Sequence, residues 1–326
     1  MASVNQSAVP DLFVRLSASF TYSALVLLGL TAYILVVMVL IRFWSEFKNP
    51  FYIIISHLAV SDIGYLTICL VIMIPLTFAA RPLYGDTVGM YIASGSTFFM
   101  WSIFFNSFMV ALNRFCVFVA PEVNLVLFER YFLISMSSPW VVAAVLTTVP
   151  NWIGCPKKFN HLRFHYYYAC EPGHFPNLIP YLTFSQAIPV MMIFMYIATY
   201  IYIKKQKASV RANDSRDERV KRRRVKGELN LMFQGMLICL MLLSLTFLFR
   251  FVPKMVRGAW GPIITSAWGI LNSSCNPFIY FVFNSFMSNK VRLILGWAQP
   301  AVETTDMRKS KRSSQKNTRK LGETPM

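Results

Sequence analysis

Charged residues are scarce in this sequence. Asp, Glu, Lys and Arg make up 14% of its 326 residues, while hydrophobic residues make up 56%. A soluble domain has about 25% charged residues and about 45–50% apolar ones. The composition therefore argues against a water-soluble protein and favours one that lies in a membrane.

Motifs of catalysis and metal binding are also missing. The sequence shows no Gly-rich phosphate loop, nucleophile triad or cluster of metal-ligating residues, and its histidines are scattered at His57, His161, His165 and His174. The internal repeats and inverted halves of many transporters are absent as well. We expect neither an enzyme nor a bound cofactor.

What the sequence does contain is a series of long apolar stretches. Seven runs are uncharged or nearly so, and each holds at least the roughly 20 apolar residues that span a bilayer. They are 16–41, 49–80, 87–113, 131–156, 172–203, 229–249 and 258–289. Lipid cannot satisfy exposed backbone groups, and the runs lack the alternation of barrel strands. The sequence predicts an all-α bundle of seven transmembrane helices.

Basic residues are distributed unevenly around these runs. Of the 32 Lys and Arg, 24 lie on the side of the C-terminus. Cytoplasmic loops carry the excess of basic residues, so the N-terminus is predicted outside and the C-terminus inside. The basic inner face suggests anionic lipids and acidic cytosolic partners, and nucleic acid is not an expected partner. Asn5 begins a glycosylation sequon on the outer side.

Four regions follow from this pattern. Residues 1–17 form the extracellular N-terminus, without an evident cleavable signal peptide. Residues 18–284 form the seven-helix domain, with helices near 18–42, 50–78, 88–117, 131–152, 177–203, 229–257 and 260–284. Residues 285–300 suit an amphipathic helix on the membrane surface. Residues 301–326 are polar and basic and are expected to be a disordered cytoplasmic tail.

Polar and helix-interrupting residues occupy telling positions in these spans. "LAVSD" places Asp62 deep in the second span, and Arg114 ends the uncharged stretch of the third. "NPFIY" places Asn276, Pro277 and Tyr280 near the inner end of the seventh. In this order, on seven helices, these features resemble the rhodopsin-like G-protein-coupled receptors over nearly the whole chain.

Finer features resemble one branch of that family. They are "LNRFCVF" followed by Pro121, and the "GC…AC" cysteines Cys155 and Cys170 of the second outer loop. Both are similar to the nematode serpentine chemoreceptors, class X or a close relative. The usual disulfide of the rhodopsin-like family, from the third span to this loop, cannot form because Gly89 stands near the expected cysteine. Cys155 and Cys170 both lie on the oxidising side, so we expect a bridge between them, and the alternative is a pair of free thiols.

The resemblance also implies roles for the inner residues. Arg114 corresponds to the arginine that contacts the G-protein tail when the sixth span swings outward; the alternative is a snorkelling anchor. Asn113 stands where the family has an acid. Asp62 and Asn276 correspond to a hydration or sodium site, and the alternative is a hydrogen-bonded structural Asp. Pro277, near Tyr280, and Pro253 are expected hinges, against simple helix curvature.

The sequence also departs from the family. The first span has Ala32 and Tyr33 where Gly and Asn are usual, so Asp62 is expected to lose a partner. The third span has Ser96 and no acid near the amine-binding place, and the seventh has Ile270 near the retinal-lysine position. Neither a biogenic amine nor retinal is an expected ligand.

A basic face near the outer end of the sixth span bears on the ligand. Arg250, Lys254 and Arg257 share one helical face and flank Pro253, with Phe251 beside them. If this face borders the ligand cavity, it favours an anionic small molecule. If the helix begins near Leu229, these cations snorkel into the outer headgroups instead.

The expected function is that of a chemosensory receptor. It binds a small extracellular ligand and activates a heterotrimeric G protein at the plasma membrane, with sensory cilia as a further expected location. The alternative is a receptor for a neuropeptide or another small ligand. A seven-helix channel or a transporter is less favoured, because the charge distribution and the lack of repeats oppose them.

Overall fold

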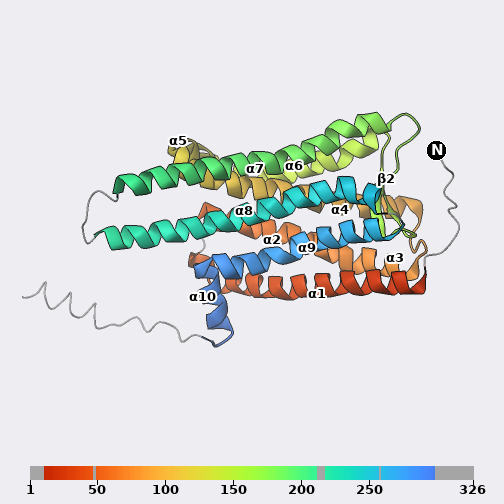
Figure 1. Cartoon of the computed structure of the whole chain (residues 1–326), viewed down its shortest axis with the longest axis horizontal. Helices are drawn as coiled ribbons and strands as arrows, with labels where there is room; N and C mark the ends of the chain where they lie inside the picture. Colours follow the sequence, from red (N-terminus) through yellow and green to blue (C-terminus); the bar gives the residue numbers. More distant parts are fainter. Residues whose placement is uncertain (1–10, 47–48, 211–216, 257, 298–326) are drawn as a thin grey trace, which may run out of the picture.

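The computed structural model describes residues 11–46, 49–210, 217–256 and 258–297 of the chain. Long helices run side by side along most of the molecule (Figure 1). They are α1 (Leu12–Arg42), α2 (Pro50–Ile68), α4 (Asp86–Val119), α6 (Phe132–Trp152), α7 (Phe175–Val210), α8 (Asp217–Met255) and α9 (Trp260–Phe283). The predicted seven-helix bundle is confirmed.

Six of these helices are long and apolar enough to cross a membrane. Helix α9 is the exception, because it carries polar residues on the face that it buries: Thr265, Asn272, Ser273, Ser274 and Asn276. It packs between α8 and α1 and closes the bundle. Its polar face makes α9 less hydrophobic than its neighbours and supplies the interior with hydrogen-bonding groups.

The second span is interrupted once. Helix α2 passes into a π-helical turn at Cys69–Met73 and then into α3 (Ile74–Ala79). Pro75 explains the change, because a proline ring clashes with the carbonyl four residues earlier in an α-helix. A π-turn gives that carbonyl more room. After α4, the short helix α5 (Pro121–Leu125) and a second π-turn (Val126–Arg130) lead into α6.

The amphipathic helix expected after the seventh span is α10 (Ser285–Ile294), which turns sharply away from the bundle axis (Figure 1). The Asn284 side chain accepts a hydrogen bond from the Met287 N–H and so caps the helix. Met287 and Val291 are buried against α1 and α9. We call the α10 end of the bundle the inner end, following the predicted orientation.

A β-hairpin lies at the opposite, outer end (Figure 1). Strand β1 (Lys157–Asn160) pairs antiparallel with β2 (His165–Tyr168). The Asn160 side chain accepts from the Leu162 and Arg163 N–H groups and tightens the turn. The sequence prediction contained only helices and missed this hairpin.

Candidate functional site

Asp62 lies at the centre of the bundle with no exposed surface. Its Oδ2 accepts hydrogen bonds from the Asn276 amide at 2.8 Å and from the Tyr33 hydroxyl at 2.6 Å. Three helices, α1, α2 and α9, thus meet at one carboxylate oxygen. Burying a carboxylate is costly unless it is hydrogen-bonded, and these donors offset that cost.

Tyr33 was not expected in this role. Because the first span has Ala32 and Tyr33 where the family has Gly and Asn, the sequence suggested that Asp62 had lost a partner from that helix. The structure corrects this expectation: the longer Tyr33 side chain reaches Asp62 and also lies 3.3 Å from the Ser273 carbonyl. The Tyr33 hydroxyl therefore takes the place of the side-chain amide of the Asn that is usual in the family.

The residues around Asp62 fit a hard cation chemically. The second carboxylate oxygen, Asp62 Oδ1, is buried without a hydrogen-bond partner, and so is Asn272 Oδ1 one turn from Asn276. Carboxylate and amide oxygens are the ligands that such cations take. Bound there, a sodium ion would supply the positive charge that Asp62 lacks in the described residues around it.

Arg114 lies at the inner end of α4, and only 7% of its surface is exposed. Its guanidinium carbon is 3.6 Å from the centre of the Phe51 ring in the first turn of α2. Attraction between a cation and a ring face holds to about 6 Å and gains strength where water is excluded. The Phe51 ring therefore holds the side chain of Arg114, the residue that the sequence analysis singled out.

The side chain of Asn113 is directed toward α5. Its amide lies 3.5 Å from Asn124 Oδ1 in α5, a weak hydrogen bond between two neutral side chains. A carboxylate at position 113 would add a charge beside Arg114, whereas the amide adds none. Position 113 thus joins α4 to the inner loop.

A narrow gap lies between the inner halves of α2, α4, α7, α8 and α9, with no room for a water molecule. Tyr280 and Tyr196 line it, and three polar atoms around it are buried without partners: Tyr280 Oη, Gln234 Oε1 and Ser107 Oγ. Unsatisfied buried polar groups are costly, so this layer has interactions left to gain by rearranging.

Gly235 of α8 makes a close approach possible beside this gap. A methyl group at that position would lie 2.0 Å from the Tyr196 hydroxyl of α7. The hydrogen atom of Gly235 therefore lets α7 and α8 pack tightly at the inner end.

The described residues of the basic face lie near the outer end of α8. Arg250, Phe251 and Lys254 are exposed on the outside of α8, and the Arg250 guanidinium donates to Gln186 of α7 at 3.0 Å. This placement follows the snorkelling alternative, and Arg257 lies outside the described residues. Pro253 lies two residues before the end of α8, near its outer end.

Pro277 lies within α9, one residue after Asn276, where the helix interior lacks one N–H donor. Tyr280 follows one turn later and is fully buried. Pro277 therefore sits between the Asp62 cluster and the inner gap. Asn5 and residues 301–326 lie outside the described residues.

The outer end is closed by the hairpin. Phe164 at its turn is fully buried, and its carbonyl accepts from the Tyr22 hydroxyl of α1 at 3.1 Å and from Ser266 of α9 at 3.4 Å. Tyr166 of β2 is also buried, with its hydroxyl unpaired. The loop thus reaches between α1, α4 and α9.

The hairpin carries the basic residue Lys157 in β1. The Lys157 ammonium lies 5.2 Å from the centre of the Tyr166 ring. Burial lowers the pKa of Lys157 to about 8, with the nearby Cys69 opposing the shift. Among the described residues, no carboxylate forms an ion pair with Lys157. Burial also lowers the pKa of His165, in β2, to about 4.

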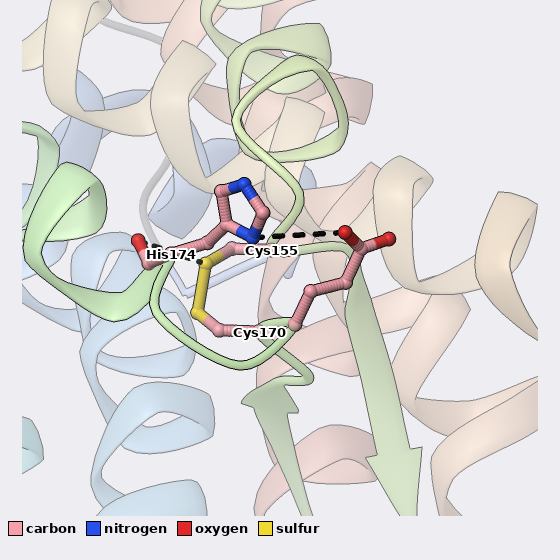
Figure 2. Close-up of polar contacts among 4 residues, drawn as sticks. Cys155, Cys170 and His174 are labelled. Atoms are coloured by element: carbon pink, nitrogen blue, oxygen red, sulfur yellow. Dashed lines mark hydrogen bonds and ion pairs between the residues drawn. A yellow bond between two sulfur atoms is a disulfide. The ribbon is translucent and has the colours of Figure 1, made fainter.

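A disulfide between Cys155 and Cys170 ties the two ends of the hairpin together (Figure 2). The Glu171 N–H donates to the Gly154 carbonyl beside it. Glu171 also lies 3.6 Å from His174 across the turn that leads into α7 (Figure 2). The cross-link restrains the loop at the point where it leaves the helices.

The fold and these two ends define a multi-pass seven-helix receptor. A family model described as serpentine type 7TM GPCR chemoreceptor Srx matches residues 24–284, and the chain belongs to that family. Rhodopsins of Sargocentron spiniferum and Sargocentron tiere are each 24% identical over 253 residues, covering 74% of this chain and 71% of theirs. The crystal structure of squid rhodopsin has the same fold, with a TM-score of 0.76, 14% identity and 92% of both chains covered.

Three residues escaped the sequence analysis. Tyr33 was noted only as a departure, Phe51 was hidden in an ordinary apolar run, and Lys157 was counted only as an outer basic residue. For Phe51 a signal existed, because it opens the second span at the same membrane depth at which Arg114 ends the third. Lys157 was missed because the sequence analysis did not predict the hairpin that positions it.

Proposed function

We propose that this protein is a chemosensory receptor of the plasma membrane, including that of sensory cilia, which binds a small extracellular ligand and activates a heterotrimeric G protein. The observation that carries the proposal is Arg114, a nearly buried cation held against Phe51 at the inner end of a chain that belongs to a chemoreceptor family.

Coupling would proceed through the inner end. An outward movement of α8 opens the gap beside Tyr196 and Tyr280, and it uncovers Arg114 for the G protein. The buried unpaired atoms Tyr280 Oη and Gln234 Oε1 then gain partners or water. These gains offset the loss of packing at Gly235, so the two states differ by little enough for a ligand to shift them.

Asp62 would transmit the change along the bundle. Its hydrogen bonds hold α1 and α9 together through Tyr33 and Asn276, just above Pro277. A sodium ion or water molecules at Asp62 Oδ1 would stabilise the resting arrangement. Expelling them while α9 shifts at Pro277 would connect the outer end to Tyr280.

The ligand would bind at the outer end under the hairpin, and we propose that it is anionic. Lys157 carries the argument, in place of the exposed Arg250 and Lys254. Its side chain is partly buried and has no acidic partner among the described residues. A partly buried cation without an acidic partner is costly, and a ligand carboxylate beside it would offset that cost. The Tyr166 hydroxyl, which is buried without a partner, is a further donor that such a group could accept from.

The test is a G-protein activation assay in heterologous cells, with a surface-displayed epitope tag to measure expression. Short carboxylic acids are compared with their amides and alcohols. We expect acids to activate the receptor and Lys157→Met to weaken them at normal surface expression. An agonist that is cationic, or acids that act equally on Lys157→Met, would contradict the ligand proposal. If no agonist is found and constitutive coupling of all G-protein classes is absent, the coupling proposal fails.

A further inference from the structure

An open groove lies on the membrane face of the bundle, where α10 meets α1 and α9. It has a volume of about 370 Å³, within the range of about 300–1,000 Å³ found for small-molecule sites. Its walls are apolar: Leu28 and Leu35 come from α1, and Phe278 and Phe281 come from α9. Leu28 and Phe278 are exposed and therefore face lipid.

The rim of the groove is built from the end of α10. Gly296 has a left-handed φ of 71°, the Trp297 N–H bonds to the Arg292 carbonyl, and the Gly296 N–H bonds to the Leu293 carbonyl. These two bonds form a Schellman motif, which ends the helix and turns the chain back. The motif brings Trp297, 76% exposed, to the mouth of the groove.

Two cations of α10 have different surroundings. Lys290 forms an ion pair with Glu46 at 2.6 Å and lies 4.2 Å from the centre of the Phe43 ring. Arg292 is exposed on the groove side and makes no ion pair or side-chain hydrogen bond in the described part of the chain. One charge on this helix is therefore neutralised, and the other is open to a ligand.

We propose that this groove is a binding site for one acidic phospholipid of the cytoplasmic leaflet. An acyl chain lies against α1 and α9, and the anionic headgroup contacts Arg292 and the hydroxyl of Ser288. Trp297 lies at the boundary between chain and headgroup, where tryptophan is enriched in membrane proteins. The site joins α10 to the bundle and does not depend on the proposed ligand or coupling partner.

A second copy of the chain fits the groove less well. A two-fold contact through this face would place the same patch of both copies together, Arg292 facing Arg292. No acidic residue lines the groove to separate them. A phospholipid supplies both the apolar chain and the missing negative charge.

The experiment is native mass spectrometry of the purified full-length receptor in a mild detergent. Phosphatidylserine and phosphatidylcholine with identical chains are added together. We expect one phosphatidylserine to be retained preferentially. Arg292→Gln should reduce that preference about 5-fold, the equivalent of about 1 kcal/mol for one cation at an anionic membrane surface. Lys290→Gln removes the same charge from the same helix and should leave the preference in place.

Further arms identify the occupant. Leu28→Trp, which fills the groove, should remove the retained lipid; Leu35→Phe serves if that variant folds poorly. Water-soluble glycerophosphoserine should not displace the lipid, because it lacks the chains. Equal losses in Arg292→Gln and Lys290→Gln would show a diffuse charge effect and overturn the proposal. It would also be overturned by no preference in the wild type, by displacement with the soluble headgroup, or by receptor dimers that strengthen in Arg292→Gln.

Discussion

The two ends of this receptor follow the family pattern to different degrees. At the inner end, each departure has a substitute from nearby: Tyr33 supplies a hydrogen bond to Asp62, and Phe51 holds Arg114 beside a neutral Asn113. At the outer end, a cross-linked hairpin enters the bundle and brings Lys157 with it. The comparison suggests that the coupling end is held to a common geometry, while the ligand end is built from the loop of the individual receptor.

The largest effect should come from the inner end. Arg114→Ala removes the cation proposed to contact the G protein and should abolish coupling while the receptor still reaches the surface. The measurement is agonist-induced G-protein activation, normalised to surface expression. Arg130→Ala is the control, since that arginine is exposed and lies 5.5 Å from the Tyr131 ring. Wild-type coupling in a well-expressed Arg114→Ala variant would remove the basis of the comparison.

The hairpin gives the next largest effect. Cys155 and Cys170 are separated by 15 residues. Closing a loop of that length stabilises a protein by about 3 kcal/mol in the chain-entropy model. Cys155→Ser and Cys170→Ser should each lower surface expression, and the double variant should be no worse than either, because both remove one bond. A silent single variant would argue against this account.

Lys157 should make agonist potency depend on pH. Its pKa of about 8 lies below the usual 10.5, so the ammonium loses its proton as the extracellular pH rises from 7 to 9. An acid agonist should therefore lose potency over that range, by about tenfold if one charge-assisted hydrogen bond is lost. Lys157→Arg keeps the charge and should flatten the dependence. An unchanged wild-type dose response across this range would contradict the role of Lys157.

Substitution of Phe51 tests whether its contact with Arg114 restrains the resting state of the receptor. Phe51→Leu keeps an apolar side chain but removes the ring under Arg114. The loss is about 1 kcal/mol for a partly desolvated cation and ring, so basal signalling should rise a few-fold. Phe51→Tyr keeps the ring and should stay near wild type. Basal activity that is equal in all three receptors would show that the contact is structural.

The smallest effect is expected at Asn113. A carboxylate in Asn113→Asp adds a charge next to Arg114, so basal signalling should fall, and it should recover as the carboxylate is protonated at mildly acidic pH. Basal activity measured from neutral to acidic pH provides the test. A variant indistinguishable from wild type at every pH would mean that Phe51 already restrains Arg114 fully.

Most ends of the seven spans were predicted within two residues because charges delimit them, but α1 begins six residues earlier than predicted, α7 ends seven later and α8 begins twelve earlier. For example, Arg42 ends α1, and α6 ends at Trp152, the residue predicted for it. The resemblance to the receptor family paired Asp62 with Asn276, and the structure joins them at one carboxylate oxygen. An Asp deep in a membrane span needs hydrogen-bond donors, and Asn276 is one of them.

Other parts depended on information that is not local. The frame of α8 was ambiguous because Pro253 suggested one depth and the apolar run another; the helix extends beyond the apolar run at both ends and ends two residues after Pro253. The hairpin strands have only four residues each and lie between two cysteines, too short for a clear alternating pattern. Tyr33 reaches Asp62 from another helix, a contact that depends on the tertiary packing.

The buried turn of the hairpin has a kinetic consequence. Phe164 is wedged between α1 and α9, and the Cys155–Cys170 bond prevents the loop from opening far. A ligand at the proposed site under the hairpin would have to wait for the hairpin to move before it could enter or leave. Association rate constants are typically about 10⁵–10⁷ M⁻¹s⁻¹ and are lower when binding requires a conformational change. Dissociation of the ligand would be slowed by the same movement. The receptor would then respond to how long a compound persists as well as to how much is present, and it would keep signalling after the stimulus has gone.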